Sequence, residues 1–263
     1  MNRIGAVLRL LPLGVAVLSA QPLPDIYKGE VHGDPPYLSQ PGWKSLLNGK
    51  DTSGWHADGG GKHEWFTTRS VNWRRVFNPK LLDANREPGD RLINGKTGKT
   101  TDLVTDEKFG DCELYLEFMV PKGSNSGVFL HGLYEVQIFD SFGYAGPLMV
   151  GDNGGIYSQP DGHGGSPPLT NASRPPGEWQ SFHIWFQAPR FDAQGKKAVN
   201  ARVLRVLLND TLVQREFELA GPTGSHKGDV VEAAQNPLML QGDHGPVAFR
   251  NIYIRPLRLD PRQ

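Results

Sequence analysis

Apolar and polar residues alternate along most of the chain in short segments, which is the pattern of strands with one face in a core. In residues 112–120 (CELYLEFMV), the apolar positions recur at every second residue: Cys112, Leu114, Leu116 and Phe118. The same pattern predicts further strands at 126–131, 133–140, 154–158, 179–187, 202–208, 211–218, 237–241 and 247–255. No long segment has helical spacing, so the sequence predicts an all-β sandwich of two antiparallel sheets with long loops.

Glycine and proline separate these segments, with 32 and 21 residues respectively. Asn209 and Asp210 connect two predicted strands, and both residue types tolerate the backbone conformation that a tight hairpin requires. Three longer connections, at 56–64, 83–100 and 159–178, are polar and rich in glycine or proline. We expect these three segments to be loops, which in a compact domain are either functional or disordered.

The segment 134–141 (YEVQIFDS) is predicted to have one apolar and one polar face. Alternation predicts that the side chains of Tyr134, Val136 and Ile138 face the core. Glu135 and Gln137 lie on the opposite face, and Asp140 follows near the end of the strand. In the preceding segment (NSGVFLHG), alternation places His131 on the same face as Glu135. This face is either the floor of a site or a flat solvated surface, and alternation alone favours the solvated surface.

Two further polar clusters contain candidate site residues. The first follows in GDNGGIYSQ and combines hydrogen-bonding groups with an aromatic ring: Asp152, Asn153, Tyr157 and Gln159. That combination suits a sugar, which has hydroxyl groups at its edge and C–H faces that stack on rings. The second lies within LMLQGDHGPVAFRNIYIRPL and comprises Gln241, Asp243, His244, Arg250 and Asn251. His244 is a candidate general base, metal ligand or plain loop residue; for Arg250 the alternative is an ion pair with a surface carboxylate.

Composition excludes some partners. The 263 residues are 38% hydrophobic, which is adequate for a packed core. The 28 basic and 28 acidic residues cancel. Because no net positive charge attracts polyanions, we expect neither a nucleic-acid partner nor attraction to an anionic membrane.

The N-terminal residues predict export. Arg3 and Arg9 precede the apolar run LLPLGVAVL, and the small residues Ser19 and Ala20 follow it. This arrangement is typical of a signal peptide at residues 1–20, and the apolar run is too short to span a bilayer. Residues 21–41 are predicted to be an extended lead-in, 42–258 the β domain and 259–263 a tail. The single Cys112 has no disulfide partner in the chain and is predicted to be a small core residue.

Several motifs together resemble one family. The segments LLNGKDTSGW, FGDCELYLEFMVPKGSNSGVFLHGLYEVQIFDS, PPGEWQSFHIWF and QGDHGPVAFRNIYIRPL are similar to the 3-keto-disaccharide hydrolase domain family. Its members are also described as 3-keto-glycoside 1,2-lyases and 3-keto-2-hydroxyglucal hydratases. The resemblance extends from Trp43 to Leu257 and departs from the family pattern at His131 and Gly242. It implies a concanavalin-like jelly roll with the site on its concave face, in an exported bacterial protein of the periplasm or extracellular space.

The resemblance also implies a reaction on an oxidised disaccharide or glycoside. A ketone at C3 acidifies the hydrogen on C2, so that the glycosidic oxygen on C1 leaves by elimination; hydration adds water to the product. The reaction needs a base, an acid and a group that stabilises the enolate. The motifs assign these catalytic roles to Glu135, His244 and Arg250. They assign sugar binding to His131, Gln137, Asp140, Asp152, Tyr157, Gln241 and Asp243.

Two features of the site stay open at the level of sequence. No cofactor is required by any motif, although a divalent metal is compatible with the ligand types His131, Glu135, Asp140 and His244. No compact ligand motif such as HExxH is present, so the metal ligands stay unassigned.

Two other functions remain as alternatives. One is a laminarinase-type glucanase, because Glu135, Gln137 and Asp140 have the offsets of its E-x-D-x-x-E motif. Retaining hydrolysis needs carboxyl groups about 5 to 5.5 Å apart, whereas residues five apart on a regular strand are roughly 16 Å apart. The glucanase therefore ranks below the lyase. The other alternative is a noncatalytic carbohydrate-binding module.

Overall fold

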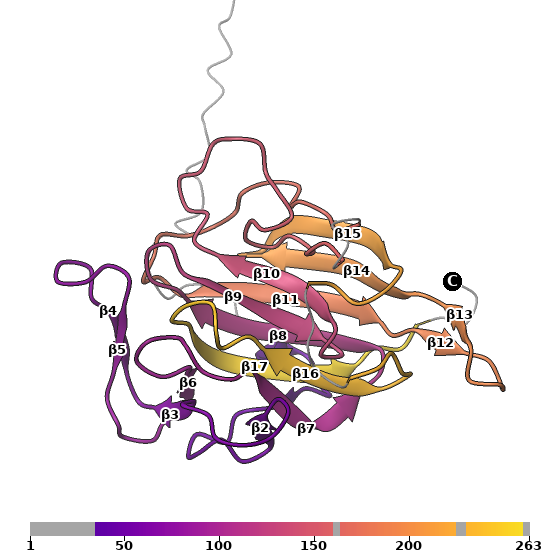
Figure 1. Ribbon diagram of the computed structural model, residues 1–263, viewed down its shortest axis with the longest axis horizontal. Helices are drawn as coiled ribbons and strands as arrows, with labels where there is room; N and C mark the ends of the chain where they lie inside the picture. Colours follow the sequence, from indigo (N-terminus) through magenta and orange to yellow (C-terminus); the bar gives the residue numbers. More distant parts are fainter. Residues whose placement is uncertain (1–34, 160–163, 225–229, 260–263) are drawn as a thin grey trace, which may run out of the picture. The chain divides into compact units, whose positions relative to one another are not determined.

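The structure, a computed structural model, describes residues 35–159, 164–224 and 230–259 (Figure 1). The predicted signal peptide (1–20) and residues 21–34 of the lead-in lie outside the described residues, as does most of the predicted tail. The described end of the lead-in contains a single-turn helix, α1 (Pro36–Ser39). In the described part of the chain, no helix has the length and hydropathy needed to cross a membrane.

The larger sheet has eight strands, and every neighbouring pair is antiparallel. Its order is β15 (Thr211–Leu219), β14 (Ala201–Leu208), β11 (Gln180–Gln187), β8 (Cys112–Met119), β17 (Ala248–Pro256), β6 (Arg91–Ile93) and β3 (Phe66–Thr68). The eighth strand, β1 (Lys44–Ser45), pairs with the second half of β17.

The smaller sheet is also antiparallel and has five strands. Its order is β10 (Tyr134–Phe139), β9 (Asn125–Leu130), β16 (Asn236–Leu240), β7 (Leu103–Phe109) and β2 (Trp55–Ala57). Two separate two-stranded ribbons complete the strands: β12 (Arg190–Phe191) with β13 (Lys197–Val199), and β4 (Val71–Trp73) with β5 (Leu82–Ala84).

The main hydrophobic core lies between the two sheets. From the larger sheet it includes Leu114, Leu116 and Phe118 of β8, and from the smaller sheet Tyr134, Val136 and Ile138 of β10. Alternation correctly predicted both of these faces. Cys112 belongs to the same core, and its burial raises the pKa of the thiol to about 12. The predicted all-β sandwich of antiparallel sheets is therefore confirmed.

Most predicted strands are present within one or two residues of the expected bounds. The exception is 154–158, which forms only isolated bridges from Ile156 to Val136 and Ser166. Two segments predicted as loops contain strands: β2 overlaps 56–64, and β6 lies inside 83–100. Strands of three residues are too short to display a period of two, which explains why alternation missed them.

The predicted hairpin between β14 and β15 is confirmed. Leu208 pairs with Thr211, and the two residues between them, Asn209 and Asp210, have φ of 50° and 63°. A two-residue turn with both φ positive matches the twist of the flanking strands, and Asn and Asp enter this conformation more readily than most residues.

A bulge in β17 decides which side chains of this strand face the core. Phe249 and Ile252 are both in the core although they are three residues apart, and the register shifts between Arg250 and Tyr253. Asn251 absorbs the extra residue with φ of 50°. Arg250 precedes the bulge and follows the core residue Phe249, so it lies on the outer face of the larger sheet.

Candidate functional site

A cavity of about 410 Å³ lies on the outer face of the smaller sheet, opposite the core. The sheet supplies its floor and the loops around it supply polar groups. Its lining consists of Asp58, Asp102, Asn125, Phe129, Glu135, Gln137, Tyr157, Gly224, Met239, Gln241, Asp243 and His244. Phe129 and Met239 form the apolar part of the lining and pack with Val104 in one hydrophobic cluster. An apolar floor surrounded by amides and carboxylates is the composition expected of a sugar site.

Glu135 extends from β10 into this cavity. Its side chain is buried, and burial raises the pKa of the carboxyl to about 8, with the negative charges of Asp102 and Asp243 contributing. The backbone N–H of Glu135 donates to Thr223 Oγ1 at 2.7 Å. On the neighbouring strand, Gly127 leaves room for the carboxyl group, because a β-carbon there would lie 2.9 Å from Glu135 Cδ. A carboxyl group that is largely protonated near neutral pH is thus held in a defined position.

Two amide oxygens in the cavity lining have no hydrogen-bond partner among the residues that the structure describes. Gln137 is 2% exposed, and its Nε2 donates to Asn125 Oδ1 at 3.0 Å while its Oε1 has no hydrogen-bond partner. Gln241 Oε1 is likewise buried and unpartnered. Buried acceptors are normally satisfied, because leaving one unpaired costs about 1–3 kcal/mol. These two oxygens therefore favour a ligand that donates hydrogen bonds, such as one with several hydroxyl groups.

Asp102 is a second carboxyl group with a raised pKa in the same cavity. Burial raises its pKa to about 6, and the nearby charges of Asp243 and Asp58 add to this. The backbone N–H of Gly242 donates to Asp102 Oδ1 at 2.8 Å, which lowers the pKa in part. Since Asp102 and Glu135 interact electrostatically, the cavity contains a pair of carboxyl groups that gain and lose protons in the neutral range.

His244 is carried by the loop that follows β16. Its Nδ1 forms a hydrogen-bonded pair with Asp243 Oδ1. Asn94 anchors the loop on both sides, since its Nδ2 donates to the carbonyl oxygens of Gly242 at 3.0 Å and Gly245 at 2.7 Å. Gly242, the position that departs from the family pattern, fits because a β-carbon there would lie 2.7 Å from Thr101 O. The loop is therefore well supported where it presents His244.

The structure brings together six of the ten residues that the sequence assigned to the site: Glu135, Gln137, Tyr157, Gln241, Asp243 and His244. They come from β10, from the loop that contains Tyr157, and from the segment after β16. The other four, Arg250, His131, Asp140 and Asp152, do not line the cavity.

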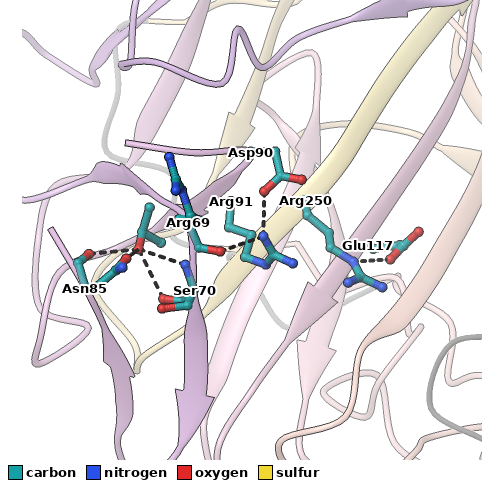
Figure 2. A network of polar contacts seen from close by, with 8 residues as sticks. Arg69, Ser70, Asn85, Asp90, Arg91, Glu117 and Arg250 are labelled. Carbon is teal, nitrogen blue, oxygen red and sulfur yellow. Dashed lines mark hydrogen bonds and ion pairs between the residues drawn. The ribbon is translucent and has the colours of Figure 1, made fainter. Parts of the chain in front are cut away.

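Arg250 is the first correction, because it lies on the outer face of the other sheet. Its Nε donates to Glu117 Oε2 at 2.5 Å, and its guanidinium lies 4.4 Å from the ring centroid of Trp179. Figure 2 shows Arg250 turned toward Glu117 and beside Arg91, its neighbour on β6. The ion-pair alternative from the sequence is therefore the arrangement found, although Glu117 is buried. Arg250 precedes the bulge at Asn251, and its facing agrees with simple alternation from the core residues Val247 and Phe249.

His131 is the second correction. The residue has φ of 57°, so the alternation of β9 ends at Leu130 and does not extend to His131. Its ring packs against Phe186, with 4.9 Å between ring centroids, and lies close to Tyr134. Burial lowers the pKa of His131 to about 4, so the ring is neutral at neutral pH. His131 is a packing residue in the structure.

Asp140 and Asp152 hold loops in place at the end of β10. Asp140 Oδ2 accepts a hydrogen bond from the backbone N–H of Gly123 at 2.8 Å. Asp152 accepts from Ser141 Oγ and from the backbone N–H of Met149, both at 2.8 Å. The offsets that suggested a glucanase motif therefore do not put Asp140 in the cavity with Glu135.

Sequence reasoning missed Asp58, Asp102 and Asn125 as cavity residues. Asp58 lies in a glycine-rich loop, and Asp102 immediately precedes β7, where no alternation distinguishes it from an ordinary loop aspartate. Asn125 begins β9, two positions before Gly127 and on the same face as it. Only the pairing of distant strands places these three residues beside Glu135.

A metal site is not assigned from the geometry. Within residues 35–159, 164–224 and 230–259, no three side chains of the types His, Cys, Asp and Glu are arranged to hold a metal ion. Of the ligand types suggested by the sequence, Glu135 and His244 line the cavity, whereas His131 and Asp140 do not.

Comparison with known proteins agrees with the fold and identifies a family. Residues 42–255 match the family described as 3-keto-alpha-glucoside-1,2-lyase-like domain. A solved structure from Parabacteroides distasonis ATCC 8503, provisionally described as a glycosyl hydrolase, is 32% identical. The match covers 82% of this chain and 84% of that chain, with a TM-score of 0.59. None of the curated proteins compared with the chain matched it.

Two more structures from the same bacterium, also provisionally described as glycosyl hydrolases, share the fold. One is 22% identical and the match covers 82% of this chain and 99% of that chain, with a TM-score of 0.52. The other is 19% identical, with coverage of 82% and 94% and a TM-score of 0.51. The jelly-roll architecture expected from the resemblance is thereby confirmed.

Proposed function

The chain belongs to the 3-keto-alpha-glucoside-1,2-lyase-like domain family, and from this premise we propose that it cleaves 3-keto-glycosides by elimination across C1 and C2. The family and its structural relatives are carbohydrate-active and enzyme-like in character. The observation that carries the proposal is that Glu135 and His244, far apart in sequence, line the same cavity with unpartnered amide oxygens.

The reaction needs one proton to leave carbon and another to reach oxygen. A base removes the proton from C2, and the electron pair forms an enolate with the C3 ketone. The enolate then collapses to a C1–C2 double bond as the bond from C1 to the glycosidic oxygen breaks. An acid protonates the departing oxygen, which yields the free aglycone and a 2-hydroxy-3-ketoglucal. Hydration of that product adds water to C1 and regenerates a 3-keto sugar.

We assign the acid to Glu135 and the base to His244. A carboxyl group with a pKa of about 8 is mostly protonated at neutral pH and can donate to a leaving oxygen. His244 is paired through Nδ1 with Asp243, which leaves Nε2 as the nitrogen that can accept a proton. This division uses the different surroundings of the two groups, one buried and one exposed.

The C3 oxygen requires a hydrogen-bond donor in place of Arg250. In the described cavity lining, the uncharged side chains with donor groups are Tyr157, Asn125, Gln137 and Gln241. Gln137 Nε2 already donates to Asn125 Oδ1, so we assign stabilisation of the developing enolate to the remaining donors, Tyr157, Gln241 and Asn125. A neutral donor of this kind stabilises an enolate in a partly desolvated site.

Conventional hydrolysis of an unoxidised glycoside is the second candidate function. It is favoured by one observation, namely that two carboxyl groups, those of Asp102 and Glu135, line the same cavity. Two carboxyl groups with separated pKa values are the apparatus of glycosidases. Unlike elimination, this reaction does not require a C3 ketone.

A pair of substrates distinguishes the two functions. Purified protein is incubated with methyl 3-keto-α-glucoside and with methyl α-glucoside, and released methanol is measured. Elimination predicts release from the keto sugar alone and incorporation of solvent deuterium at C2 of recovered substrate when proton removal is reversible. Comparable release from the unoxidised glucoside would refute elimination and favour hydrolysis.

A binding module without activity is tested in the same experiment. It would release no methanol from either substrate while still protecting the protein against thermal unfolding in the presence of sugar. His244→Gln is the informative variant, since it retains a polar side chain but cannot act as a base of comparable strength. Lys50→Gln, in the exposed loop that precedes β2, is the matched control and keeps full activity.

A further inference from the structure

The ribbon of β4 and β5 ends in an apolar tip. Figure 1 shows this ribbon extending away from the two large sheets, with its connecting loop furthest out. At the tip, Val76 is 83% exposed and Phe77 is 93% exposed. These are the two most exposed large hydrophobic side chains in the described part of the chain. Adjacent apolar side chains with this degree of exposure favour contact with another surface.

The loop that carries the tip is held in shape by its own hydrogen bonds. The backbone N–H of Asn78 donates to Arg74 O at 3.0 Å, and that of Leu81 donates to Asn78 O at 3.0 Å. Trp73 Nε1 donates to Pro79 O at 2.8 Å. The exposure of Val76 and Phe77 is therefore built into an ordered loop.

The base of the ribbon is anchored in a second hydrophobic cluster. Val71 and Leu82 pack there with Ile93 and Met119, and Trp73 packs against the same cluster. Pro79 O also accepts a hydrogen bond from the backbone N–H of Lys122 at 2.9 Å. Because its base is packed against the domain, the ribbon can bind a surface at its tip and stay folded.

Basic residues flank the tip in the sequence. Arg74, Arg75 and Lys80 flank Val76 and Phe77, and no acidic residue occurs from 74 to 82. Arg74 pairs with Asp83, while Arg75 lies over the ring of Trp73 at 5.9 Å. The chain is neutral as a whole, so this local positive excess was not visible in its net charge.

We propose that the tip of the β4–β5 ribbon docks the protein on an anionic lipid surface, with Phe77 and Val76 entering the interface and the basic side chains contacting headgroups. Two apolar side chains flanked by basic ones match a bilayer interface, where the apolar interior meets anionic headgroups. They are too few to form a specific protein interface, which buries about 800 Å² on each partner. The attachment is weak and reversible, because one tip supplies all of its contacts.

Vesicle sedimentation tests this attachment. The protein is mixed with vesicles of phosphatidylglycerol and phosphatidylcholine, and separately with vesicles of phosphatidylcholine alone. We expect binding to the anionic vesicles at low salt, and at least a severalfold loss near 0.5 M salt, where the Debye length is only about 4 Å. Equal binding to both kinds of vesicle, or binding to neither, would overturn the proposal.

Substitutions locate the contact. Phe77→Ser and the double change Arg75→Gln with Lys80→Gln should each lower binding by at least about fivefold. Val199→Ser is the matched control, since Val199 is 45% exposed on β13, far from β4 in Figure 1. All three variants change exposed residues and should keep the wild-type melting temperature. Binding that survives Phe77→Ser would place the contact elsewhere and refute the proposal.

A fluorescent label reports whether the tip enters the lipid. Cys112 is the only cysteine of the chain and is buried, so Val76→Cys can be labelled selectively. An environment-sensitive dye at position 76 should shift to the blue with anionic vesicles only. The alternative occupant is a second copy of the chain. If the dye responds to protein concentration without vesicles, and Phe77→Ser converts a dimer to a monomer, the tip is a self-association surface and lipid docking is wrong.

Discussion

The carboxyl group of Glu135 fills the space beside Gly127 that any larger residue at position 127 would occupy. Gly127 pairs with Gln137 across the β9–β10 ladder, and the carboxyl group of Glu135, two residues before Gln137, occupies the gap. The absence of a side chain at one position thus orients the functional group at another.

Gly127→Ala should therefore reduce activity without large loss of stability. The new methyl group would displace the carboxyl group by about 1 Å or more, and a displacement of this size at a reacting group can cost about a hundredfold in rate. The measurement is kcat/KM on a 3-keto-glucoside together with the melting temperature. Gly110→Ala is the control, because a β-carbon at position 110 meets nothing closer than 3.4 Å. Full activity of Gly127→Ala would show that the position of Glu135 is unimportant.

Replacing Glu135 by Gln tests its role as an acid. The variant should lower the rate about a hundredfold or more for a methyl leaving group. A 4-nitrophenyl leaving group departs without protonation, so the loss for that substrate should be much smaller. Equal losses for both leaving groups would indicate that Glu135 acts in another step.

The pH profile of the wild type gives a second measure of the same acid. The protonated form of Glu135 is lost as pH rises through its pKa of about 8, so kcat/KM for the methyl glycoside should decline above that pH. The decline should be absent for the 4-nitrophenyl substrate. An identical alkaline decline with both substrates would assign it to a different group.

Arg250→Met should affect stability and leave the activity of the folded protein unchanged. The substitution leaves the buried carboxylate of Glu117 without its cationic partner, and such a loss lowers the free energy of unfolding by about 3 kcal/mol in comparable buried pairs. Urea unfolding gives the free energy, and kcat per folded molecule gives the activity. Adding Glu117→Gln to the variant should restore part of the stability. A selective loss of kcat would instead return Arg250 to the mechanism.

His131→Asn should make stability less sensitive to acid. The pKa of His131 is about 4 in the folded protein against 6.5 for the free side chain, so only the unfolded chain binds its proton between these values. The free energy of unfolding therefore falls as pH falls from 6.5 to 4, and His131 contributes to that fall. Asn tolerates the positive φ at this position. The slope of unfolding free energy against pH should be smaller in the variant, and a slope equal to wild type would contradict the prediction.

If the chain is exported, the mature protein should have a defined N-terminus. We propose that the chain is cleaved after Ala20, so that the exported protein begins at Gln21. N-terminal sequencing of protein recovered from the periplasm or culture fluid measures this. Ala20→Arg should block cleavage, whereas Gln21→Asn should not. Recovery of an uncleaved chain from the wild type would contradict the prediction.

Alternation predicted the facing of site residues where the backbone is regular, whereas the resemblance assigned them to a site. Glu135 and Gln137 lie on an undistorted strand, and their facing follows directly from the core residues between them. Prediction failed at His131, because its positive φ ends the alternation of β9. For Arg250 the resemblance, not alternation, suggested a place in the site, and alternation from the core residue Phe249 agrees with its position on the outer face. A local sequence pattern contains little information about where the alternation of a strand is interrupted.

The loop residues of the site could not be predicted for a different reason. Asp102 reaches the cavity beside Gly242, which is 140 positions away in the chain. Neither residue lies in an alternating segment that would predict which way it faces. Their proximity follows from the pairing of β7 with β16, which depends on the whole sheet order.

The bulge at Asn251 also separates the two parts of β17 that pair with different strands. On one edge of β17, residues 248–250 pair with β6 and residues 253–254 pair with β1, so the extra residue lies at the junction. If Asn251 were instead a regular strand residue, inside and outside would be exchanged for the following half of the strand, moving Arg255 toward the core and Ile254 out of it. Without Asn251, Phe249 and Ile252 would be two residues apart, so a homologue lacking this residue would keep the same core residues on a strand without the bulge.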